Sequence, residues 1–483
     1  MIDALVEYLK NKKILILGFG IEGYSTYNFI RKYIKKQKIY ISDVKPETIE
    51  KYKDVIEDTN VEILGKDRYF KELEDYDIIM KSPGISFANM DTTKFFHKIK
   101  SQLELFLEFI DVFTIGVTGT KGKSTTSSLI YEIISKQRRD VHLLGNIGVP
   151  LFDEIDKLTK KSVVVLELSS HQLEYVEVSP NISIILNIFE EHLDHYKSYE
   201  HYINAKLNIC RYQKENDYFI YNIDNKILSE HVLKMGDLKP NIYQISMQQK
   251  EENNNVGATT CCVQSKENSK AQIPKLITKQ GNTVTTETGE LLYSDSENRQ
   301  ILGDHNFNNI MFAITVAKIM NLDLRIANET IYKFEPLPHR MEFVGEFDGV
   351  KYYNDSIATV PASTINGVQT LKEVNTLIIG GKDRGIDYTE FADFLGKTNI
   401  EHLIGLPDTG WKIADMVVNE DMEKYIVKDM QMAVSFARKL TKKGSVCLLS
   451  PAASSYGFFK NFKERGELFK RLVKEDGSNK KIN

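Results

Sequence analysis

A glycine-rich loop between a predicted strand and a predicted helix constrains this chain more than any other stretch. Gly116–Thr126 reads GVTGTKGKSTT, after the apolar run Phe113–Val117 and before apolar residues at helical spacing. Glycines let backbone N–H groups turn inward, and the helix N-terminus and Lys123 add positive charge. The loop therefore predicts a nucleoside triphosphate site, with the Ser124 hydroxyl available to Mg²⁺. The usual pattern has a glycine where this chain has Val117, so the alternative is a glycine turn with a surface lysine.

Length and composition indicate a multidomain protein from a reducing compartment. A chain of 483 residues allows about two to four domains with ample cores. The net charge of −4, with many charges of both signs, favours neither nucleic acid nor an anionic membrane as a partner. The cysteines lack metal-ligand spacing, and no apolar run is long enough to span a membrane. The N-terminus lacks the features of a signal peptide, so we expect a cytoplasmic protein.

The first region carries a pattern typical of dinucleotide-binding folds. A predicted strand at 12–17 precedes the sequence GFGIEG from Gly18, and Asp43 follows a second predicted strand at 39–41. Three glycines followed by an acid at this spacing predict an NAD site. Two alternatives stay open, a tight turn that binds nothing and a site for another nucleotide such as a UDP group. Glu22 would lie unfavourably beside a phosphate.

A third segment of this region predicts a strand and then a turn. Residues 77–85 read DIIMKSPGI, so the strand ends near Ser82, Pro83 and Gly84. Ligands of open α/β sheets gather at the carboxyl edge of the strands. We therefore expect this turn to lie beside the glycine loop.

Polar side chains in the central region follow strands of the same predicted sheet as the phosphate loop. Glu167 ends an apolar strand, where a buried carboxylate is costly unless a cation meets it, so it is a candidate Mg²⁺ ligand or a helix cap. Asn146 is a polar side chain of another loop. His192 follows the predicted strand 182–188 and is either a loop histidine or a metal ligand. Lys206 on its own predicts a solvated helix lysine.

Two segments before the last region differ in character. The polar stretch 248–299 predicts a surface excursion with a hairpin at about 283–293. Asn306 and Asn309, three residues apart, lie on one face of the first turn of a predicted helix. That face suits recognition of a base or phosphate, and the alternative is helix capping.

The last region begins at a proline-rich linker, Pro336 to Pro338. Predicted strands then alternate with helices, at 351–353, 376–379, 402–404 and 446–449. This alternation indicates a further α/β domain whose loops share one sheet edge. We therefore expect an α/β protein with three domains, at 1–107, 108–336 and 337–483.

Eight motifs in order resemble those of Mur ligases, the ATP-dependent amino-acid ligases of peptidoglycan precursor synthesis. They are GTKGKST from Gly119, ELSSHQLE from Glu167, NIFEEHLDHY from Asn187, GDHNFNN from Gly303, LPHRME from Leu337, NDSIAT from Asn354, GGKDRG from Gly380 and SPAASSYGFFKNFKERG from Ser450. Within the family, the sequence is most similar to the ligases that use D-glutamate. The resemblance spans almost the whole chain, except 248–299.

The resemblance implies a fold, an activity and a set of ligands. The fold would have an N-terminal Rossmann-like UDP-binding domain, a central domain with the parallel sheet of P-loop ATPases, and a C-terminal Rossmann-like α/β domain. The activity would be the ligation of D-glutamate to UDP-N-acetylmuramoyl-L-alanine through an acyl phosphate. ATP, two Mg²⁺ ions and a carbamylated Lys206 would take part. We expect a cytoplasmic monomer without a nucleic-acid or membrane partner.

The resemblance also implies roles for individual residues. The UDP group would be held by Gly18, Gly20, Gly23, Asp43, Ser82, Pro83 and Gly84. ATP would be bound by Gly119, Thr120, Lys121, Gly122, Lys123, Ser124, Thr125, Asn306, Asn309, Arg340 and Asp355. One Mg²⁺ would bind Ser124 and Glu167, and the other His192 and carbamylated Lys206. Asn146 would position the substrate, and glutamate would be lined by Thr359, Arg384, Ser455 and Phe462.

Three positions depart from the family pattern, namely Ile357, Arg384 and Gly457. Relatives often have lysine at the first, lysine at the second and aspartate at the third. These departures leave open L-glutamate, another amino acid or another Mur ligase step. Outside this activity, the alternatives are an NAD-dependent oxidoreductase, a catalytically silent nucleotide-binding module and a folylpolyglutamate-type ligase. The last would not need the loop at 18–23.

Overall fold

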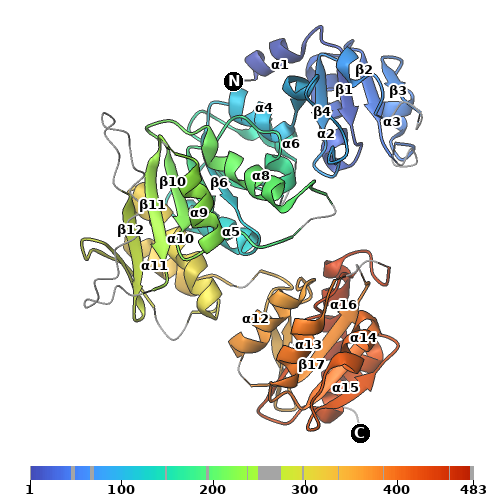
Figure 1. Cartoon of the computed structure of the whole chain (residues 1–483), viewed down its shortest axis with the longest axis vertical. Helices are drawn as coiled ribbons and strands as arrows, with labels where there is room; N and C mark the ends of the chain where they lie inside the picture. The colour runs from blue at the N-terminus through green and yellow to red at the C-terminus, as the bar shows by residue number, and fades with distance from the viewer. Residues whose placement is uncertain are drawn as a thin grey trace. The chain divides into compact units, whose positions relative to one another are not determined.

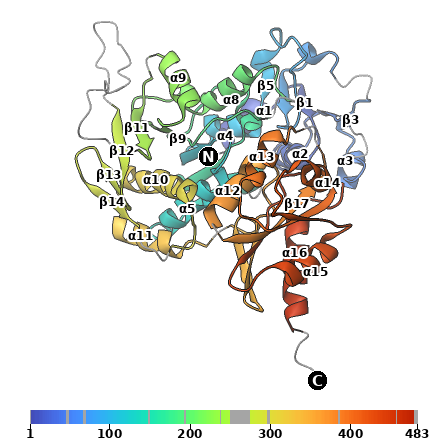
Figure 2. The same ribbon diagram turned by 60° about the horizontal axis from the view of Figure 1, so that its bottom comes forward.

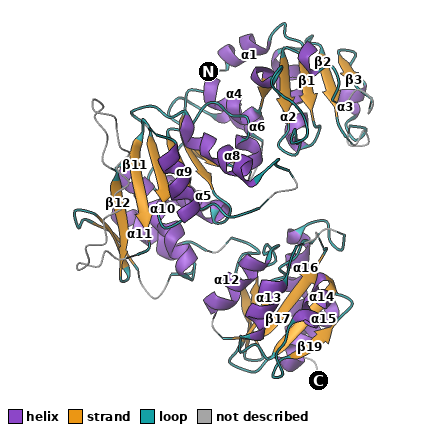
Figure 3. Cartoon of the chain, viewed as in Figure 1, coloured by secondary structure: helices purple, strands orange, loops and turns teal. Residues whose placement is uncertain are grey.

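Three β-sheets with flanking helices follow one another along the chain (Figures 1 and 3). The computed structural model describes residues 2–44, 49–65, 70–146, 150–191, 195–236, 238–248, 274–295, 299–335, 337–371, 373–383, 386–455 and 457–478. The chain divides into two compact units, Met1–Arg299 with His305–Phe334, and Gln300–Asp304 with Glu335–Asn483. The first unit holds the first two sheets and the second unit holds the third. The predicted α/β fold class is confirmed.

The first sheet consists of five parallel strands in the order β3-β2-β1-β4-β5. The strands are β1 Ile14–Leu17, β2 Ile39–Ser42, β3 Val61–Ile63, β4 Ile78–Lys81 and β5 Ile99–Lys100, with helices α1 Asp3–Leu9, α2 Ile21–Tyr33, α3 Lys53–Ile56 and α4 Gln102–Phe109. This strand order is that of nucleotide-binding Rossmann folds. The predicted strands at 12–17 and 39–41 are confirmed.

The second sheet has nine strands in the order β14-β13-β12-β11-β10-β9-β6-β8-β7. The parallel strands are β6 Phe113–Thr118, β7 Val141–Gly145, β8 Val163–Glu167, β9 Ile182–Ile185, β10 Tyr218–Asn222, β11 Asn241–Ser246 and β12 Lys275–Gln280. β13 Thr283–Thr286 and β14 Leu291–Ser294 are antiparallel, which confirms the predicted hairpin and adds it to the sheet.

Helices cover both faces of this second sheet. They are α5 Lys123–Ser135, α6 Leu151–Glu154, α7 Ser170–Leu173, α8 Tyr199–Arg211, α9 Lys226–Lys234, α10 Asp304–Ile319 and α11 Leu324–Lys333. Figure 2 shows α8 and α9 on one side of the strands, with α5, α10 and α11 on the other. Strands covered on both faces read as continuous apolar runs, as β8 does.

The third sheet has six strands in the order β15-β16-β20-β17-β18-β19. They are β15 Glu342–Phe347, β16 Val350–Asn354, β17 Val374–Gly381, β18 His402–Asp408, β19 Glu423–Ile426 and β20 Val446–Leu449, with helices α12 Pro361–Leu371, α13 Thr389–Gly396, α14 Thr409–Met416, α15 Met430–Leu440 and α16 Phe462–Ser478. β15 pairs antiparallel with β16, and the other pairs are parallel. The four predicted strands are confirmed.

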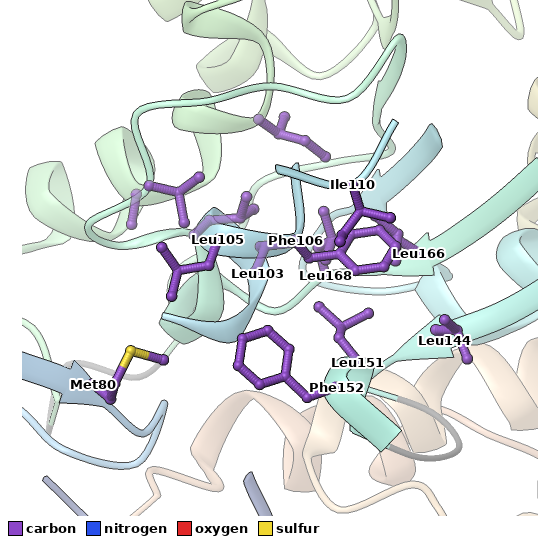
Figure 4. Close-up of a cluster of buried hydrophobic side chains, with 14 of the residues drawn as sticks. Met80, Leu103, Leu105, Phe106, Ile110, Leu144, Leu151, Phe152, Leu166 and Leu168 are labelled. Carbon is purple, nitrogen blue, oxygen red and sulfur yellow. The ribbon is translucent and has the colours of Figure 1, made fainter. Parts of the chain in front are cut away.

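One hydrophobic core joins the first and second sheets (Figure 4). Met80 of β4, Phe106 of α4 and Leu166 of β8 all belong to it. The rings of Phe29 in α2 and Phe152 in α6 lie 4.6 Å apart between centroids. Each such side chain stabilises the fold by about 1.5–3 kcal/mol on burial, so these two sheets form a single compact unit. Within the described ranges, no helix has both the length and the apolar character to cross a membrane.

Candidate active site

The phosphate loop joins the end of β6 to the first turn of α5. Gly122 precedes Lys123 with a φ of 88°, a left-handed conformation that favours glycine. A β-carbon at Gly122 would lie 2.7 Å from Oδ1 of Asn309 in α10, so the glycine also allows Asn309 to reach the loop. The predicted phosphate site and the predicted asparagine therefore lie together.

Other residues predicted to bind ATP flank this loop. Asn309 Nδ2 donates to Asn306 Oδ1 over 3.1 Å, and both side chains are buried. The prediction that they share one helix face is therefore confirmed. Ser124 and Thr125 lie in the first turn of α5, where Ser124 is half-buried and Thr125 is buried.

Two lysines meet at one carbonyl of the loop. Lys123 Nζ donates to the carbonyl oxygens of Gly119, at 2.9 Å, and Thr120, at 3.1 Å. Lys206 Nζ donates to the same Gly119 oxygen over 3.0 Å. Burial, and then the charge of Lys123, lower the pKa of Lys206 well below its ordinary value.

The prediction of a solvated lysine at Lys206 is wrong. The side chain is 2% exposed, because it extends from the buried face of α8 that also holds Ile203 and Leu207. A buried ammonium whose hydrogen-bond partner is a neutral carbonyl is costly, so the environment favours the neutral amine.

Tyr202 is a further residue of this site, and none of the sequence motifs indicated it. Its hydroxyl lies 2.8 Å from Thr120 Oγ1, and its ring centroid lies 4.9 Å from Lys206 Nζ. Thr120 Oγ1 also accepts from the backbone N–H of Phe189 over 2.9 Å. The spacing in the sequence could have indicated this role, because Tyr202 and Lys206 are four residues apart and therefore lie on one face of the helix.

Hydrogen bonds and an ion pair connect the loop after β9 to the phosphate loop. Lys121 N–H donates to Asn187 Oδ1 over 2.9 Å, and Asn187 Nδ2 returns a bond to the Lys121 carbonyl over 3.1 Å. Lys121 Nζ forms a 3.0 Å ion pair with Glu191. His192, the next residue, lies outside the described residues, so its predicted metal role stays a prediction.

Glu167 presents a carboxylate oxygen that fits a cation. Its side chain is 1% exposed, and Oε1 accepts from Asn146 Nδ2 over 2.7 Å. Oε2 is buried and has no hydrogen-bond partner among the described atoms. An anionic oxygen in that state is costly unless a cation binds it, and Mg²⁺ prefers such oxygen ligands.

The alternative of a helix cap at Glu167 is wrong. Ser169 caps α7 in a capping box with Gln172. Asn146, which also donates its backbone N–H to the Glu167 carbonyl at 2.8 Å, lies beside the carboxylate as a second polar group of the site. Across the described ranges, His, Cys, Asp and Glu side chains form no cluster of three that could hold a metal.

The three predicted UDP segments meet at the carboxyl edge of the first sheet. Gly18 N–H donates to the Ser42 carbonyl, and Ser82 Oγ donates to the Gly18 carbonyl over 2.6 Å. Phe19 N–H donates to Asp43 Oδ2 over 2.6 Å. The other predicted residues lie in the same segments: Gly20 caps α2, Gly23 is in its first turn, and Pro83 and Gly84 follow Ser82.

Glu22, predicted to lie unfavourably beside a phosphate, interacts with Gln172 and with the charge of Lys81. Its Oε1 accepts from Gln172 Nε2 in α7 over 3.1 Å. Burial raises the pKa of this carboxyl, while the bond from Gln172 and the charge of Lys81 oppose that change. The carboxylate is thus held by the second sheet's helix.

In the second unit, Asp355 is a buried carboxyl beside charged residues. Its Oδ2 accepts from Ser450 Oγ over 2.8 Å, and Oδ1 accepts from Met341 N–H over 3.2 Å. Burial raises its pKa to about 7, against the bond from Ser450 and the charge of Arg340. The predicted Asp355 and Arg340 therefore lie within electrostatic reach of each other.

Arg465 joins the loops that carry the predicted glutamate site, although sequence reasoning assigned it no role. Its guanidinium is fully buried and donates to the carbonyl oxygens of Ser356, Gly380 and Ala453 over 2.8–3.3 Å, and also to Ser356 Oγ over 3.0 Å. Arg465 lies in the motif that begins at Ser450, and this position was the only sequence feature that could have indicated its role.

The predicted glutamate residues take different positions around these loops. Ser455 is buried, and Thr359 and Phe462 are half-buried. The Phe462 carbonyl accepts from Ser356 Oγ over 2.8 Å. Arg384 lies outside the described residues. Gly457 has a φ of 93°, a left-handed conformation that favours glycine at this position.

Comparison with known proteins gives consistent matches over almost the whole chain. Family models match residues 117–317, "Mur ligase middle domain", and 339–453, "Mur ligase, glutamate ligase domain". A UDP-N-acetylmuramoylalanine–D-glutamate ligase of Clostridium kluyveri is 31% identical over 98% of this chain and 99% of its own length. The ligases of the same name from Clostridium botulinum (strain Langeland) and Clostridioides difficile are 32% and 31% identical over 97% and 96% of this chain, and 97% and 99% of their own.

Solved structures show the same fold at lower identity. The MurF ligase of Thermotoga maritima in complex with ADP has a TM-score of 0.57 and 15% identity, over 99% of this chain and all of that one. The UDP-N-acetylmuramate–alanine ligase MurC of the same organism has a TM-score of 0.56 and 19% identity, over 95% of this chain and 98% of that one. The first and third sheets, accordingly, belong to Rossmann-like domains.

Proposed function

Because the chain belongs to the Mur ligase family, we propose that it is an ATP-dependent ligase that adds D-glutamate to UDP-N-acetylmuramoyl-L-alanine. The product serves peptidoglycan precursor synthesis. The observation that carries the proposal is a phosphate loop bonded to the buried Lys206, with the buried Glu167 carboxylate at the end of the neighbouring strand β8, in a chain that matches D-glutamate ligases over nearly its whole length.

The proposed reaction has two steps. The terminal carboxylate of the L-alanyl group attacks the γ-phosphorus of ATP, the bond to the β-phosphate breaks, and an acyl phosphate and ADP form. The amine of glutamate then attacks the acyl carbon, loses a proton and expels phosphate. Both transition states carry dispersed negative charge, so positioned cations provide most of the stabilisation.

The residues of the first unit have defined tasks in this proposal. Gly119 to Thr125 surround the phosphates, and Lys123 exchanges its bonds to loop carbonyls for bonds to phosphate oxygens. Bound Mg²⁺ would neutralise charge on the phosphates. Glu167 and Ser124 would hold one ion, which would give the buried Glu167 Oε2 the partner that it lacks. Asn146, bonded to Oε1 of the same carboxylate, would orient the substrate carboxylate.

We further propose that Lys206 is carbamylated and, with His192, holds a second ion. The neutral Nζ attacks the carbon of CO₂, one C=O electron pair moves onto oxygen, and Nζ loses a proton to water, which leaves a carbamate with one negative charge. The buried environment supports this reaction because it lowers the pKa of Lys206. A carbamate would also turn repulsion between Lys206 and Lys123 into attraction.

The proposal divides the chain into three working parts. Residues 1–107 hold the UDP group through Gly18–Gly23, Asp43 and Ser82–Gly84, and residues 108–336 hold ATP with the help of Asn306 and Asn309. Residues 337–483 contribute Arg340 and Asp355 to ATP and line glutamate with Thr359, Arg384, Ser455 and Phe462. The enzyme would work in the cytoplasm as a monomer.

Phosphate release tests this proposal directly. ATP, Mg²⁺ and UDP-N-acetylmuramoyl-L-alanine are supplied with D-glutamate, with L-glutamate or without an amino acid. Release that depends on D-glutamate is expected. Release only with L-glutamate, the alternative suggested by Ile357, Arg384 and Gly457, would keep the mechanism and change the product. No release with either enantiomer would overturn the proposed reaction.

A further inference from the structure

Two side-chain contacts join the expected UDP-sugar site to the helix that follows Glu167. Glu22, in the first turn of α2, accepts from Gln172 of α7 over 3.1 Å. Lys81, the last residue of β4, donates to Glu174 Oε2 at the end of α7 over 3.2 Å. Both pairs thus connect the carboxyl edge of the first sheet to one short helix of the second. We call these two pairs the α7 seam.

Lys81 is the more constrained member of the α7 seam. Its side chain is 3% exposed and that of Glu174 is 14% exposed. His195 Nε2 lies 3.2 Å from the same Glu174 oxygen, and the Tyr175 ring centroid lies 5.2 Å from Lys81 Nζ. A buried ion pair is sensitive to geometry, because removing one partner leaves an uncompensated charge.

Lys81 and α7 are each close in sequence to a residue of a predicted site, the UDP site in the first case and the Mg²⁺ site in the second. Ser82, the next residue, donates to the Gly18 carbonyl and belongs to the predicted UDP segments. On the other side, α7 begins three residues after Glu167, the candidate Mg²⁺ ligand. A shift of Lys81 relative to Glu174 would therefore move one substrate site relative to the other.

We propose that Lys81 is a positioning residue whose clamp on Glu174 sets the distance between the UDP-sugar site and the phosphate loop. This inference rests on the proposed function, since the substrate carboxylate has to reach the γ-phosphate of ATP. Attack requires the reacting atoms to come within about 3–3.5 Å of each other. Lys81 also places a positive charge near Glu22, which reduces the repulsion between that carboxylate and a diphosphate.

The test compares the two Michaelis constants of full-length variants. Lys81→Met is expected to raise KM for UDP-N-acetylmuramoyl-L-alanine, and lower kcat, on the order of 10- to 100-fold, since small misplacements are costly. KM for ATP should stay within about twofold, because the phosphate loop keeps its contacts. Lys81→Arg, which keeps the charge, should recover most of the loss. Lys94→Met is the matched control, because its 3.3 Å pair with Glu74 is exposed.

A merely structural role predicts a different pattern. Partial unfolding lowers the amount of active enzyme and hence the apparent kcat, but it leaves both KM values unchanged. Lys81→Met with wild-type constants, or with both KM values raised equally, would overturn the inference. If Lys81→Met does not fold, the isosteric Glu174→Gln decides by the same split between the two KM values. Wild-type protein without amino-acid-dependent phosphate release would instead contradict the proposed function, so the two failures are distinguishable.

Discussion

Lys123 and Lys206 each donate a hydrogen bond to the carbonyl oxygen of Gly119, over 2.9 and 3.0 Å. One lysine begins α5 and the other comes from α8, so the phosphate loop gathers two amines at a single acceptor. Two ammonium groups that share one acceptor repel each other, and burial of Lys206 adds to the free-energy cost of its charged form. The site therefore favours a change in the charge of Lys206.

Lys206→Ala should remove nearly all D-glutamate-dependent phosphate release, by about 10³-fold or more, since it removes a group that stabilises the transition state. Acetate or another short carboxylate should restore part of the activity, because it can replace the carbamate oxygens. Initial rates at increasing acetate concentration provide the measurement. Lys226→Ala, at an 89% exposed position in α9, is the control. It should keep wild-type activity, and acetate should not alter its rate. Full activity of Lys206→Ala without acetate would refute the carbamate.

Glu167→Gln should raise the Mg²⁺ concentration needed for half-maximal activity by about tenfold or more, because the ion loses an anionic ligand. The melting temperature without Mg²⁺ should stay the same or rise, since the substitution removes a buried charge with an unpartnered oxygen. Mg²⁺ titrations and thermal melts of the same samples test both effects. Glu177→Gln, at an exposed position, serves as the control. An unchanged Mg²⁺ requirement would show that Glu167 is not a metal ligand.

Sequence reasoning succeeded where the physical pattern is local. The apolar runs of β8 and β9 predict buried strands, and the structure has them at those places. β15 and β19 were missed because they are edge strands without a fully buried side chain, so no apolar run marks them.

The site was harder to predict where burial depends on distant residues. Lys206 is buried because the Gly119 carbonyl, 87 residues earlier, lies against its helix face. Arg465 satisfies carbonyl groups that are as far as 109 residues away. A polar residue in a helix usually indicates solvent exposure, and only the tertiary structure shows that these two side chains point inward.

Asp355 should make the stability of the second unit depend on pH. Burial raises its pKa from 3.8 to about 7, so the folded state holds a proton that the unfolded state releases. The free energy of unfolding should therefore fall as the pH rises from about 4 to about 7. Chemical unfolding of the wild type and Asp355→Asn across this range provides the measurement. The variant should lose this part of the slope, and identical slopes would contradict the raised pKa.

Arg465→Lys should destabilise the second unit by about 3 kcal/mol, because a buried guanidinium that is hydrogen-bonded to several carbonyls loses most of its donors. Lysine has three N–H donors on a single nitrogen and cannot reach Ser356, Gly380 and Ala453 in the same geometry. Urea unfolding that resolves the two units should show the loss in the second unit alone. Arg471→Lys, at a 64% exposed position of α16, is the matched control.

Since the three loops also carry the predicted glutamate site, KM for D-glutamate should rise in Arg465→Lys while KM for UDP-N-acetylmuramoyl-L-alanine stays constant. Unchanged unfolding and an unchanged KM for glutamate would mean that these loops hold their positions without the guanidinium.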